Sequence, residues 1–153
     1  DCRVDPRHLS FDKGNAGCMI RVKNMMLVIR MRGARKPQNA DKLDIPSGKS
    51  EGEETAQCTA HREVWEETGL DVEVGRLLHR FGNGFSLYAC APKAEDSLRD
   101  KFAVPESGRD EVKEILLIDP STMANRATKL TESWRFPEQG EVFSKAFEKL
   151  AEP

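Results

Sequence analysis

The stretch from Ile45 to Leu70 constrains this chain more than any other part of it. A short loop opens at Gly48, and the segment that follows, Glu54 to Thr68, contains no glycine or proline and several good helix formers. Gly69 then stands where a residue in the left-handed conformation commonly ends a helix. The stretch therefore predicts a loop that leads into a single helix.

Three glutamates share one edge of this predicted helix. Glu63 precedes Glu66 and Glu67 by three and four positions, the spacing at which helical side chains are neighbours. Like charges at this spacing destabilise an isolated helix, so a bound cation would stabilise the arrangement. Clustered carboxylate oxygens suit hard divalent cations such as Mg²⁺ or Mn²⁺. The alternative interpretation is a solvated acidic helix face.

The same stretch resembles the signature of the Nudix hydrolases at every fixed position. That signature consists of Gly, five residues, Glu, seven residues, Arg-Glu, an apolar residue, any residue, Glu-Glu, any residue, Gly and an apolar residue. Its positions are filled here by Gly48, Glu54, Arg62, Glu63, Val64, Glu66, Glu67, Gly69 and Leu70. Ser47 stands where the family usually has a further glycine.

The resemblance implies a divalent-metal-dependent pyrophosphohydrolase with Mg²⁺ or Mn²⁺ as its cofactor. Such an enzyme cleaves a diphosphate linkage in a nucleoside diphosphate linked to another group, by attack of a metal-activated water on phosphorus. The expected partner is thus a small nucleotide or another diphosphate. A non-catalytic nucleotide-binding or regulatory module on the same fold is the alternative, because a fold does not fix a function. The glycine replaced by Ser47 supports that alternative.

The resemblance also implies roles by position. Glu66 and Glu67 are expected to bind metal together with the backbone carbonyl of Ser47, and Glu63 to be either a ligand or the base that deprotonates water. Arg62 is expected to pair with Glu54 or to orient Glu63. Gly48, Glu54 and Gly69 are expected to shape the motif.

Two further segments offer candidates for the site. The family often adds an acidic ligand from outside the signature, and the long polar loop Pro92 to Asp110 with the residues after it supplies four: Glu106, Asp110, Glu111 and Glu114. We favour Glu111 among them. A basic segment after an apolar run carries Arg30, Arg32 and Arg35, which are candidates to bind substrate phosphates. A solvated basic loop is the alternative. Four aromatic residues are candidates to stack a base: Phe81, Phe85, Tyr88 and Trp134.

The rest of the chain predicts a mixed sheet covered by helices on two sides. Strands are expected in six segments: Gly17 to Val22, Met25 to Met31, Leu43 to Pro46, Leu70 to Arg80, Phe85 to Ala91 and Glu111 to Asp119. A short helix is expected at Pro120 to Ala124, an irregular segment at Ala127 to Phe136, and an amphipathic helix from Pro137 to Leu150. The fold class is therefore α/β, and the resemblance specifies a Nudix-type α/β/α sandwich with a mixed sheet.

Length and charge set broad limits. The 153 residues predict a single domain, 1–153, in which residues 1–15 form an irregular N-terminal arm. A formal net charge of −2 gives no sign of a general nucleic-acid surface, and no apolar run is long enough to span a bilayer. We expect a monomer or a homodimer.

The four cysteines leave the compartment open. Their spacing does not fit a zinc site. Cys2 and Cys18 are candidates for a disulfide that ties the arm to the first strand, with Cys58 and Cys90 as buried thiols; four reduced thiols are the alternative. We expect a cytoplasmic protein by default, and a periplasmic or secreted one if Cys2 and Cys18 are bonded.

Overall fold

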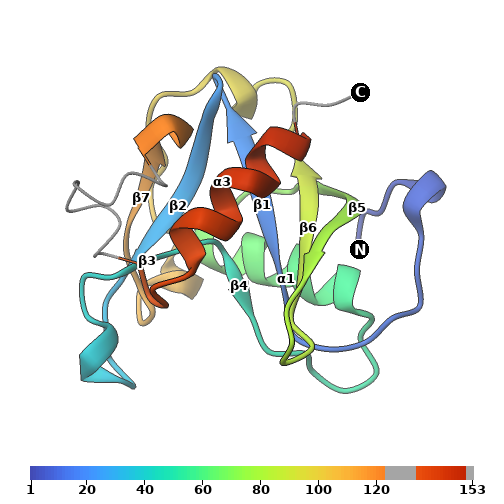
Figure 1. The fold of residues 1–153 in the computed structure, drawn as a ribbon, viewed down its shortest axis with the longest axis horizontal. Coiled ribbons are helices and arrows are strands. Elements are labelled where there is room, and N and C mark those ends of the chain that lie inside the picture. The colour runs from blue at the N-terminus through green and yellow to red at the C-terminus, as the bar shows by residue number, and fades with distance from the viewer. Residues whose placement is uncertain (123–133, 151–153) are drawn as a thin grey trace.

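The computed structural model describes residues 1–122 and 134–150, which contain seven strands and two α-helices (Figure 1). The strands are β1 (Ala16–Val22), β2 (Met25–Met31), β3 (Leu43–Asp44), β4 (Ser47–Gly48), β5 (Glu73–Arg80), β6 (Ser86–Ala91) and β7 (Val112–Ile118). The helices are α1 (Ala56–Thr68) and α3 (Gln139–Leu150).

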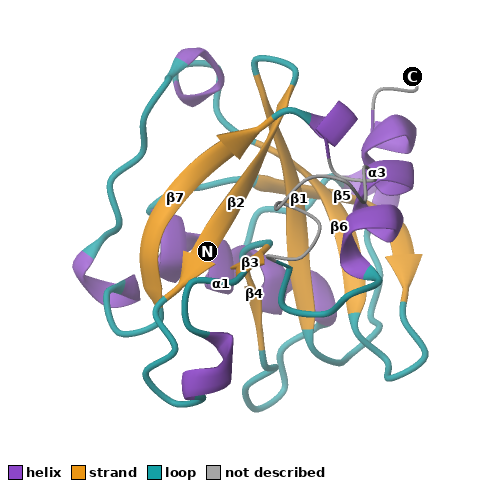
Figure 2. Cartoon of the chain, turned by 60° about the vertical axis from the view of Figure 1, so that its left-hand side comes forward, coloured by secondary structure: helices purple, strands orange, loops and turns teal. Residues whose placement is uncertain are grey.

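The strands form one mixed sheet with the order β3-β2-β1-β6-β5, in which β4 also pairs with β1 and β7 with β2. Strands β1 and β6 run parallel, whereas β2 is antiparallel to β1, β3 and β7. In Figure 1, α3 crosses in front of the strands and α1 lies behind them. Figure 2 shows the two helices separated by the sheet. The predicted α/β/α sandwich is confirmed.

The apolar residues divide between the two faces of the sheet. One cluster joins α1 to the sheet through Ala60 and Val64, which pack with Ile20 and Leu27. The other joins α3 to the opposite face through Phe143 and Phe147. The middle of β2 is buried on both faces, as its continuous apolar run predicts.

The hairpin between β1 and β2 has a two-residue loop with an unusual sequence. Val22 pairs with Met25, and Lys23 and Asn24 between them have φ values of 51° and 63°. Two successive left-handed residues are the geometry of a type I′ turn, whose twist matches that of the flanking strands. Asn tolerates this conformation well, whereas Lys adopts it less readily.

Most predicted elements are confirmed, with four corrections. The strand expected over Leu43 to Pro46 is interrupted, since β3 ends at Asp44 and β4 begins at Ser47. The C-terminal helix begins at Gln139 and not at Pro137. The arm contains one short 3-10 turn, Pro6–His8. The short helix expected at Pro120 to Ala124 is a 3-10 turn over Pro120–Thr122, and residues 123–133, with most of the predicted irregular segment, lie outside the described residues.

The predicted Cys2–Cys18 disulfide is wrong, as is the expectation of free thiols at the other two cysteines. Cys2 is bonded to Cys58 on α1, with Cα atoms 5.4 Å apart. Cys18 is bonded to Cys90, with Cα atoms 5.5 Å apart, because the parallel pairing of β1 and β6 brings the two residues together. In the described ranges, no helix has the length and apolar character needed to cross a membrane.

Candidate active site

The signature helix α1 is capped at both ends by its own sequence. The hydroxyl of Thr55 accepts a hydrogen bond from the Cys58 N–H, which satisfies one of the unpaired donors of the first turn. Gly69 ends the helix with a φ of 77°, in the left-handed region that favours glycine. These caps fix where the acidic edge of the helix begins and ends.

Arg62 is the centre of the charged network on this edge. Its Nε lies 2.7 Å from Glu54 Oε2, and its terminal nitrogens donate to the Lys49 carbonyl at 2.8 Å and to Glu63 at 3.0 Å. Glu66 accepts from the same guanidinium at 3.2 Å. The bond from Arg62 is the largest cause that lowers the pKa of Glu54. Arg62 therefore pairs with Glu54 and also contacts Glu63.

Three carboxylates from two segments of the chain meet beside this network. Glu63, Glu67 and Glu111 each offer an oxygen within 4.8 Å of the others. Glu63 and Glu67 are buried, with 8% and 4% of their surfaces exposed, whereas Glu111 is exposed. Four acidic residues outside the signature were candidates to join these glutamates. Glu111, the one we favoured, lies in the cluster.

Burial and mutual repulsion raise the proton affinity of this cluster. Desolvation is the largest cause that raises the pKa of Glu63 to about 7, and Glu66 and Glu111 raise it further while Arg62 opposes them. Burial likewise raises the pKa of Glu67, with Glu63 and Glu111 adding to the effect. Within the described part of the chain, no ion pair reaches Glu67, whose Oε1 accepts a hydrogen bond of 2.8 Å from the Ser47 N–H.

The donor set fits a hard divalent cation. All three groups are carboxylates, two are buried, and the burial of unneutralised carboxylates is costly. Oxygen-only sites of this kind suit Mg²⁺ or Mn²⁺. The residues present thus fit the cation that the motif implies.

The long loop before β7 delivers Glu111 to the cluster. Ser107 Oγ donates to the Glu66 carbonyl at 2.7 Å, so the loop is bonded to the end of α1. Gly108 packs on the same turn, where an added Cβ would lie 2.7 Å from that carbonyl oxygen. Ser107 and Gly108 are contacts that the sequence analysis did not identify.

The three predicted arginines are not gathered at one place. Arg30 pairs with Glu114 at 2.9 Å, and Arg32 donates to the Arg109 carbonyl at 2.7 Å. Arg35 is exposed and lies 3.6 Å from Glu111, next to the carboxylate cluster. Of these three arginines, Arg35 is therefore the one whose contact reaches the cluster.

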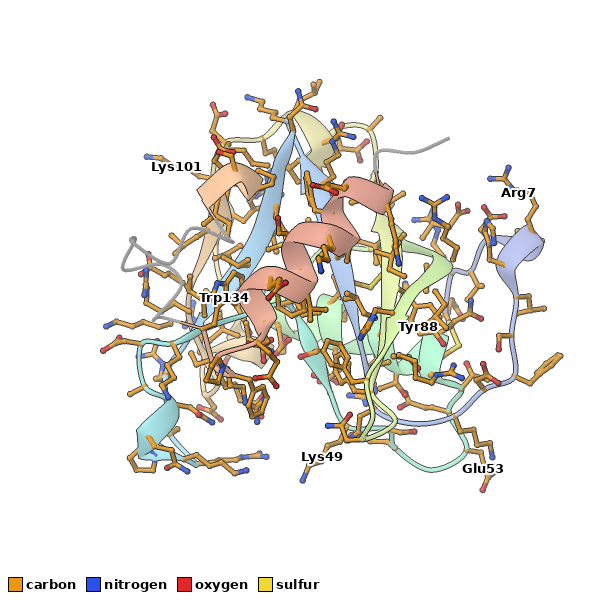
Figure 3. The ribbon with its side chains drawn as sticks, viewed as in Figure 1. Arg7, Lys49, Glu53, Tyr88, Lys101 and Trp134 are labelled. Atoms are coloured by element: carbon orange, nitrogen blue, oxygen red, sulfur yellow. A yellow bond between two sulfur atoms is a disulfide. The ribbon has the colours of Figure 1, made fainter. Side chains whose placement is uncertain are left out.

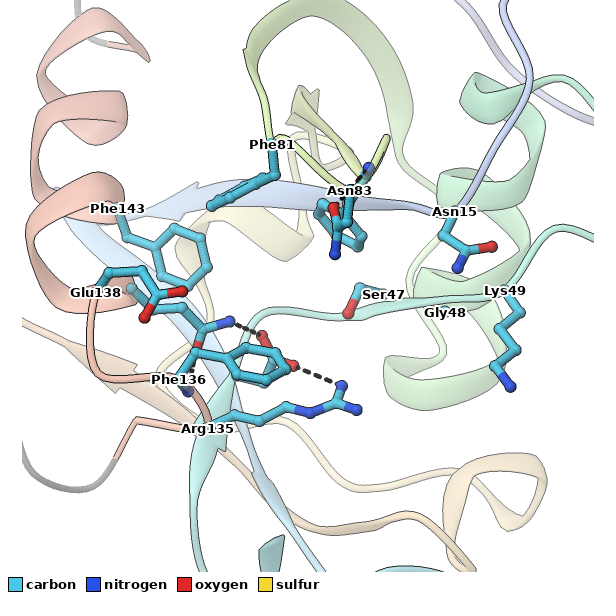
Figure 4. Close-up of a pocket in the computed structure, with 13 residues that line it drawn as sticks. Asn15, Ser47, Gly48, Lys49, Phe81, Asn83, Arg135, Phe136, Glu138 and Phe143 are labelled. Carbon is cyan, nitrogen blue, oxygen red and sulfur yellow. Dashed lines mark hydrogen bonds and ion pairs between the residues drawn. The ribbon is translucent and has the colours of Figure 1, made fainter.

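A pocket of about 260 Å³ adjoins the cluster (Figure 4). Ser47 and Gly48 line it from the signature loop, Phe81 and Phe85 from the β5–β6 hairpin, and Arg135 and Phe136 from the segment before α3; the remaining lining residues are Asn15, Asp44, Lys49, Asn83, Glu138, Gln139 and Phe143. Of the four aromatic candidates, Phe81 and Phe85 line the pocket, while Tyr88 and Trp134 are buried in the core.

The signature loop connects the pocket to the carboxylates. The Glu63 carboxyl packs directly against Gly48, and an added Cβ at Gly48 would overlap it. Because Ser47 and Gly48 also line the pocket, a ligand there lies against the residues that contact Glu63 and Glu67. The pocket and the cluster are therefore parts of one site.

Sequence reasoning missed the polar residues of this pocket. Asp44 is 4% exposed, and three groups donate to it: the Ile45 N–H, Gln139 and Arg135. The sequence signals were weak, namely an acidic residue within an apolar strand and an Arg-Phe pair before the last helix. Neither signal shows that the two segments lie side by side, with Leu43 bridged to Trp134.

Comparison with known proteins agrees with this geometry. A family model described as NUDIX domain matches residues 13–115. The chain belongs to the Nudix family. The resemblance found in the signature is thereby confirmed, and with it the expectation of a hydrolase at the level of the family. Comparison with curated proteins gives no significant match.

Solved Nudix structures share the fold. A Nudix hydrolase from Nitrosomonas europaea is similar with a TM-score of 0.65 and 18% identity, over 95% of this chain and 78% of that one. An ADP-ribose pyrophosphatase from Streptococcus suis aligns with a TM-score of 0.62 and 16% identity, over 90% and 91%. A MutT protein from Methanosarcina mazei Go1 gives 0.58 and 19%, over 93% and 95%.

Proposed function

We propose that the protein is a divalent-metal-dependent pyrophosphohydrolase that cleaves a diphosphate linkage in a nucleoside diphosphate linked to another group. The observation that supports this most directly is the meeting of Glu63, Glu67 and Glu111 beside a pocket lined by the signature loop. Buried carboxylates next to a concave, partly aromatic pocket suit a small phosphorylated substrate bound together with a cation.

The proposed ligands of Mg²⁺ or Mn²⁺ are the carboxylates of Glu67 and Glu111 and the backbone carbonyl of Ser47. When bound, such an ion neutralises phosphoryl oxygens and lowers the pKa of a coordinated water. Glu63, with a pKa of about 7, suits proton transfer near neutral pH, and we assign it to accept a proton from the attacking water. Glu66, the other ligand that the motif implies, is bonded to Arg62 at 3.2 Å.

The other charged residues are proposed to position these groups. Arg62, fixed by Glu54 and the Lys49 carbonyl, holds the Glu63 carboxylate in its orientation. Gly48 leaves room for that carboxylate, and Gly69 ends the helix that carries it. Arg35 is the arginine that we propose to contact substrate phosphate, because it is exposed and lies 3.6 Å from Glu111 of the cluster, whereas Arg30 and Arg32 bond to the Asp41 and Arg109 carbonyls.

The case for a non-catalytic module rested on Ser47, and the backbone weakens it. Lys23, Asn24 and Asp41 are the non-glycine residues of positive φ in the described ranges, so Ser47 adopts a conformation that needs no glycine. Its N–H donates to Glu67. Tight nucleotide binding without phosphate release, across metals and pH, would be the outcome that favours the module.

The test is hydrolysis of a panel of nucleotide diphosphate derivatives with Mg²⁺ and Mn²⁺, by wild type and Glu67→Gln. The variant should fold normally and lose about a hundredfold or more in turnover, because the group proposed to hold the metal is lost. Glu53→Gln is the matched control, since that side chain is 94% exposed and points away from the molecule (Figure 3). Turnover by Glu67→Gln near that of wild type would overturn the assignment.

We also propose that the protein works in an oxidising compartment. Two disulfides, Cys2–Cys58 and Cys18–Cys90, support this, since structural disulfides persist outside the reducing cytosol. Localisation of the protein in its native cells would test the proposal, and detection in the cytosol alone would contradict it.

A further inference from the structure

Glu111 is the exposed member of the carboxylate cluster, and its side chain has little to hold it there. That side chain is 45% exposed, and in the part of the chain that the structure describes its one ion-pair partner is Arg35, 3.6 Å away. Arg35 is itself 86% exposed, and pairs between exposed side chains contribute little. Glu63 and Glu67 offer oxygens within 4.8 Å and repel the Glu111 carboxylate when they are ionised. The groups that keep Glu111 in the cluster therefore act on its backbone.

The loop that leads to Glu111 is anchored first to the end of α1. Ser107 Oγ donates to the Glu66 carbonyl at 2.7 Å. That carbonyl belongs to the last turn of α1, where C=O groups have no N–H partner within the helix. Gly108 is buried against the same turn, since an added Cβ would lie 2.9 Å from the Glu67 Cα. The loop is thus fastened to the helical turn that carries Glu66 and Glu67.

The second anchor comes from the end of β2. Arg32 follows Met31, the last residue of β2, and its Nε donates to the Arg109 carbonyl at 2.7 Å. The Arg32 N–H also donates to the Glu111 carbonyl at 2.9 Å. Between the anchors, the Glu111 N–H donates to the Gly108 carbonyl at 3.1 Å, so the anchored residues belong to one tight turn. A hydrogen bond from a charged guanidinium is roughly twice as strong as one between neutral groups. Arg32, which the sequence offered as a phosphate ligand, thus holds by two bonds the turn that carries Glu111.

We propose that Ser107 and Arg32 are positioning residues for metal binding, which hold the Glu111 carboxylate beside Glu67 before the cation binds. The inference rests on the proposed function, in which Glu67 and Glu111 are ligands of Mg²⁺ or Mn²⁺. A ligand that is already in place loses less conformational freedom on binding than one that must be brought in from solvent. Replacement of a residue that orients a metal ligand commonly weakens metal binding tenfold or more. Neither residue contacts the ion in this arrangement, so both act through Glu111.

Binding of Mn²⁺ in the absence of substrate tests the inference. Electron paramagnetic resonance of free Mn²⁺ in the presence of the whole protein gives the dissociation constant without any turnover. Ser107→Ala and Arg32→Ala should each raise this constant by about tenfold, whereas Ser107→Thr, which keeps the hydroxyl, should bind as wild type does. Ser97→Ala and Arg3→Ala are the matched controls and should leave it unchanged. Ser97 Oγ and the Arg3 guanidinium also donate to backbone carbonyls, at 2.7 Å and 2.9 Å, but those carbonyls lie outside the loop and α1.

A double-variant cycle separates positioning from a general structural role. Glu111→Gln should weaken Mn²⁺ binding without abolishing it, because Glu67 and the Ser47 carbonyl remain. Adding Ser107→Ala or Arg32→Ala to Glu111→Gln should cause no further loss, because the carboxylate that they position is gone. A residue that acted through the fold as a whole would weaken binding by the same factor in both backgrounds. Thermal unfolding shows whether each variant folds, and since the anchors come from different segments, either one supplies the test if the other variant does not fold.

The outcomes separate this inference from the proposed function. Mn²⁺ binding that needs both anchors, in a protein that hydrolyses no diphosphate, would support the positioning and overturn the pyrophosphohydrolase. Metal-dependent hydrolysis, with Mn²⁺ binding that neither Ser107→Ala nor Arg32→Ala changes, would do the reverse. An unchanged constant in one variant alone would overturn the role of that residue. A full further loss in the Glu111→Gln background, or no binding of Mn²⁺ by wild type at millimolar concentration, would also overturn the positioning.

Discussion

At the scale of single residues, the site depends on how closely Gly48 approaches Glu63. The Glu63 carboxyl packs where the side chain of any other residue at position 48 would begin. The backbone of Gly48 does not have a positive φ, so its conformation alone does not require glycine. Space, and not backbone strain, therefore explains why the signature needs glycine at this position.

Gly48→Ala should damage the site more than the fold. The new Cβ must displace the Glu63 carboxyl, so we expect turnover to fall at least tenfold, while crowding costs about 1–3 kcal/mol of stability. Steady-state kinetics and chemical denaturation would measure the two effects. Gly82→Ala is the matched control, because Gly82 has no atom within 4 Å of an added Cβ and no positive φ. Unchanged turnover in Gly48→Ala would contradict the close packing.

The residues that the sequence predicted are those whose position follows from spacing along one helix. Glu63, Glu67 and Arg62 belong to a fixed pattern on α1, so their proximity needs no knowledge of the fold. Glu111 had to be chosen from four acidic residues, because its place depends on how the loop packs on α1. Asp44 and Arg135 are 91 residues apart, and no local pattern indicates that they meet.

At the scale of elements, the N-terminal arm acts as a second cap on the signature helix. The Asp12 carbonyl accepts from the Ala56 N–H at 2.7 Å, and Gln57 bonds to the arm through the Ser10 N–H and the His8 carbonyl. The first bond satisfies a backbone N–H of the first helical turn that has no partner within the helix, and the Gln57 side chain ties the arm to the same turn. The Cys2–Cys58 disulfide fastens the arm to the same turn.

The sequence could not predict how the cysteines pair, for a related reason. Four cysteines allow three pairings, and the correct one depends on contacts between distant segments. Cys18 and Cys90 are 72 residues apart and meet because β1 and β6 are parallel neighbours. Nearness in the sequence favoured Cys2 with Cys18, but the arm pairs with β5 at Val74 and bonds to the first turn of α1, which brings Cys2 to Cys58.

Cys2→Ser should loosen the arm without unfolding the sheet. We expect faster amide hydrogen exchange at residues 1–15 and in the first turn of α1, with little change in β1 and β6, because the second disulfide still joins those strands. Exchange followed by mass spectrometry measures this. Cys18→Ser is the comparison: in the chain-entropy model the loss of either disulfide costs about 4 kcal/mol, so the two variants should differ in where protection is lost, which for Cys18→Ser is β1 and β6. Equal protection of the arm in Cys2→Ser and wild type would show that the disulfide is not what holds it.

At the scale of the whole molecule, the site lies where both layers of the sandwich contribute. Helix α1 and its core cluster supply Glu63 and Glu67, whereas α3 and its cluster on the other face supply the pocket wall at Phe143. Strand β4 pairs with β1 between these layers and carries Ser47. The fold thus presents buried carboxylates at one end of the sheet, and their burial couples the stability of the protein to pH and to bound metal.

The sign of that coupling follows from the raised pKa of Glu63. Its folded value is about 7, above the ordinary value of 4.5, so its protonated form is stabilised by folding. This contribution is complete below about pH 4.5 and is lost as the pH rises through 7. Glu67 acts in the same direction. Glu54, whose pKa is lowered by Arg62, acts oppositely, but its contribution is lost only as the pH falls below about 4.5, outside this window.

We therefore expect metal and protons to compete for the cluster. In EDTA, the contribution of Glu63 makes the protein less stable at pH 8 than at pH 5, whereas Glu63→Gln should lose less stability over this range. Added Mg²⁺ or Mn²⁺ should stabilise the wild type more at pH 8 than at pH 5, because the carboxylates must lose their protons before they bind the ion. Denaturant unfolding at pH 5, 6, 7 and 8, with EDTA or with metal, measures both effects, and Glu53→Gln should behave as wild type. Stabilisation by metal of equal size at pH 5 and pH 8 would show that the ion binds without deprotonation of this cluster, and it would contradict Glu67 as a ligand.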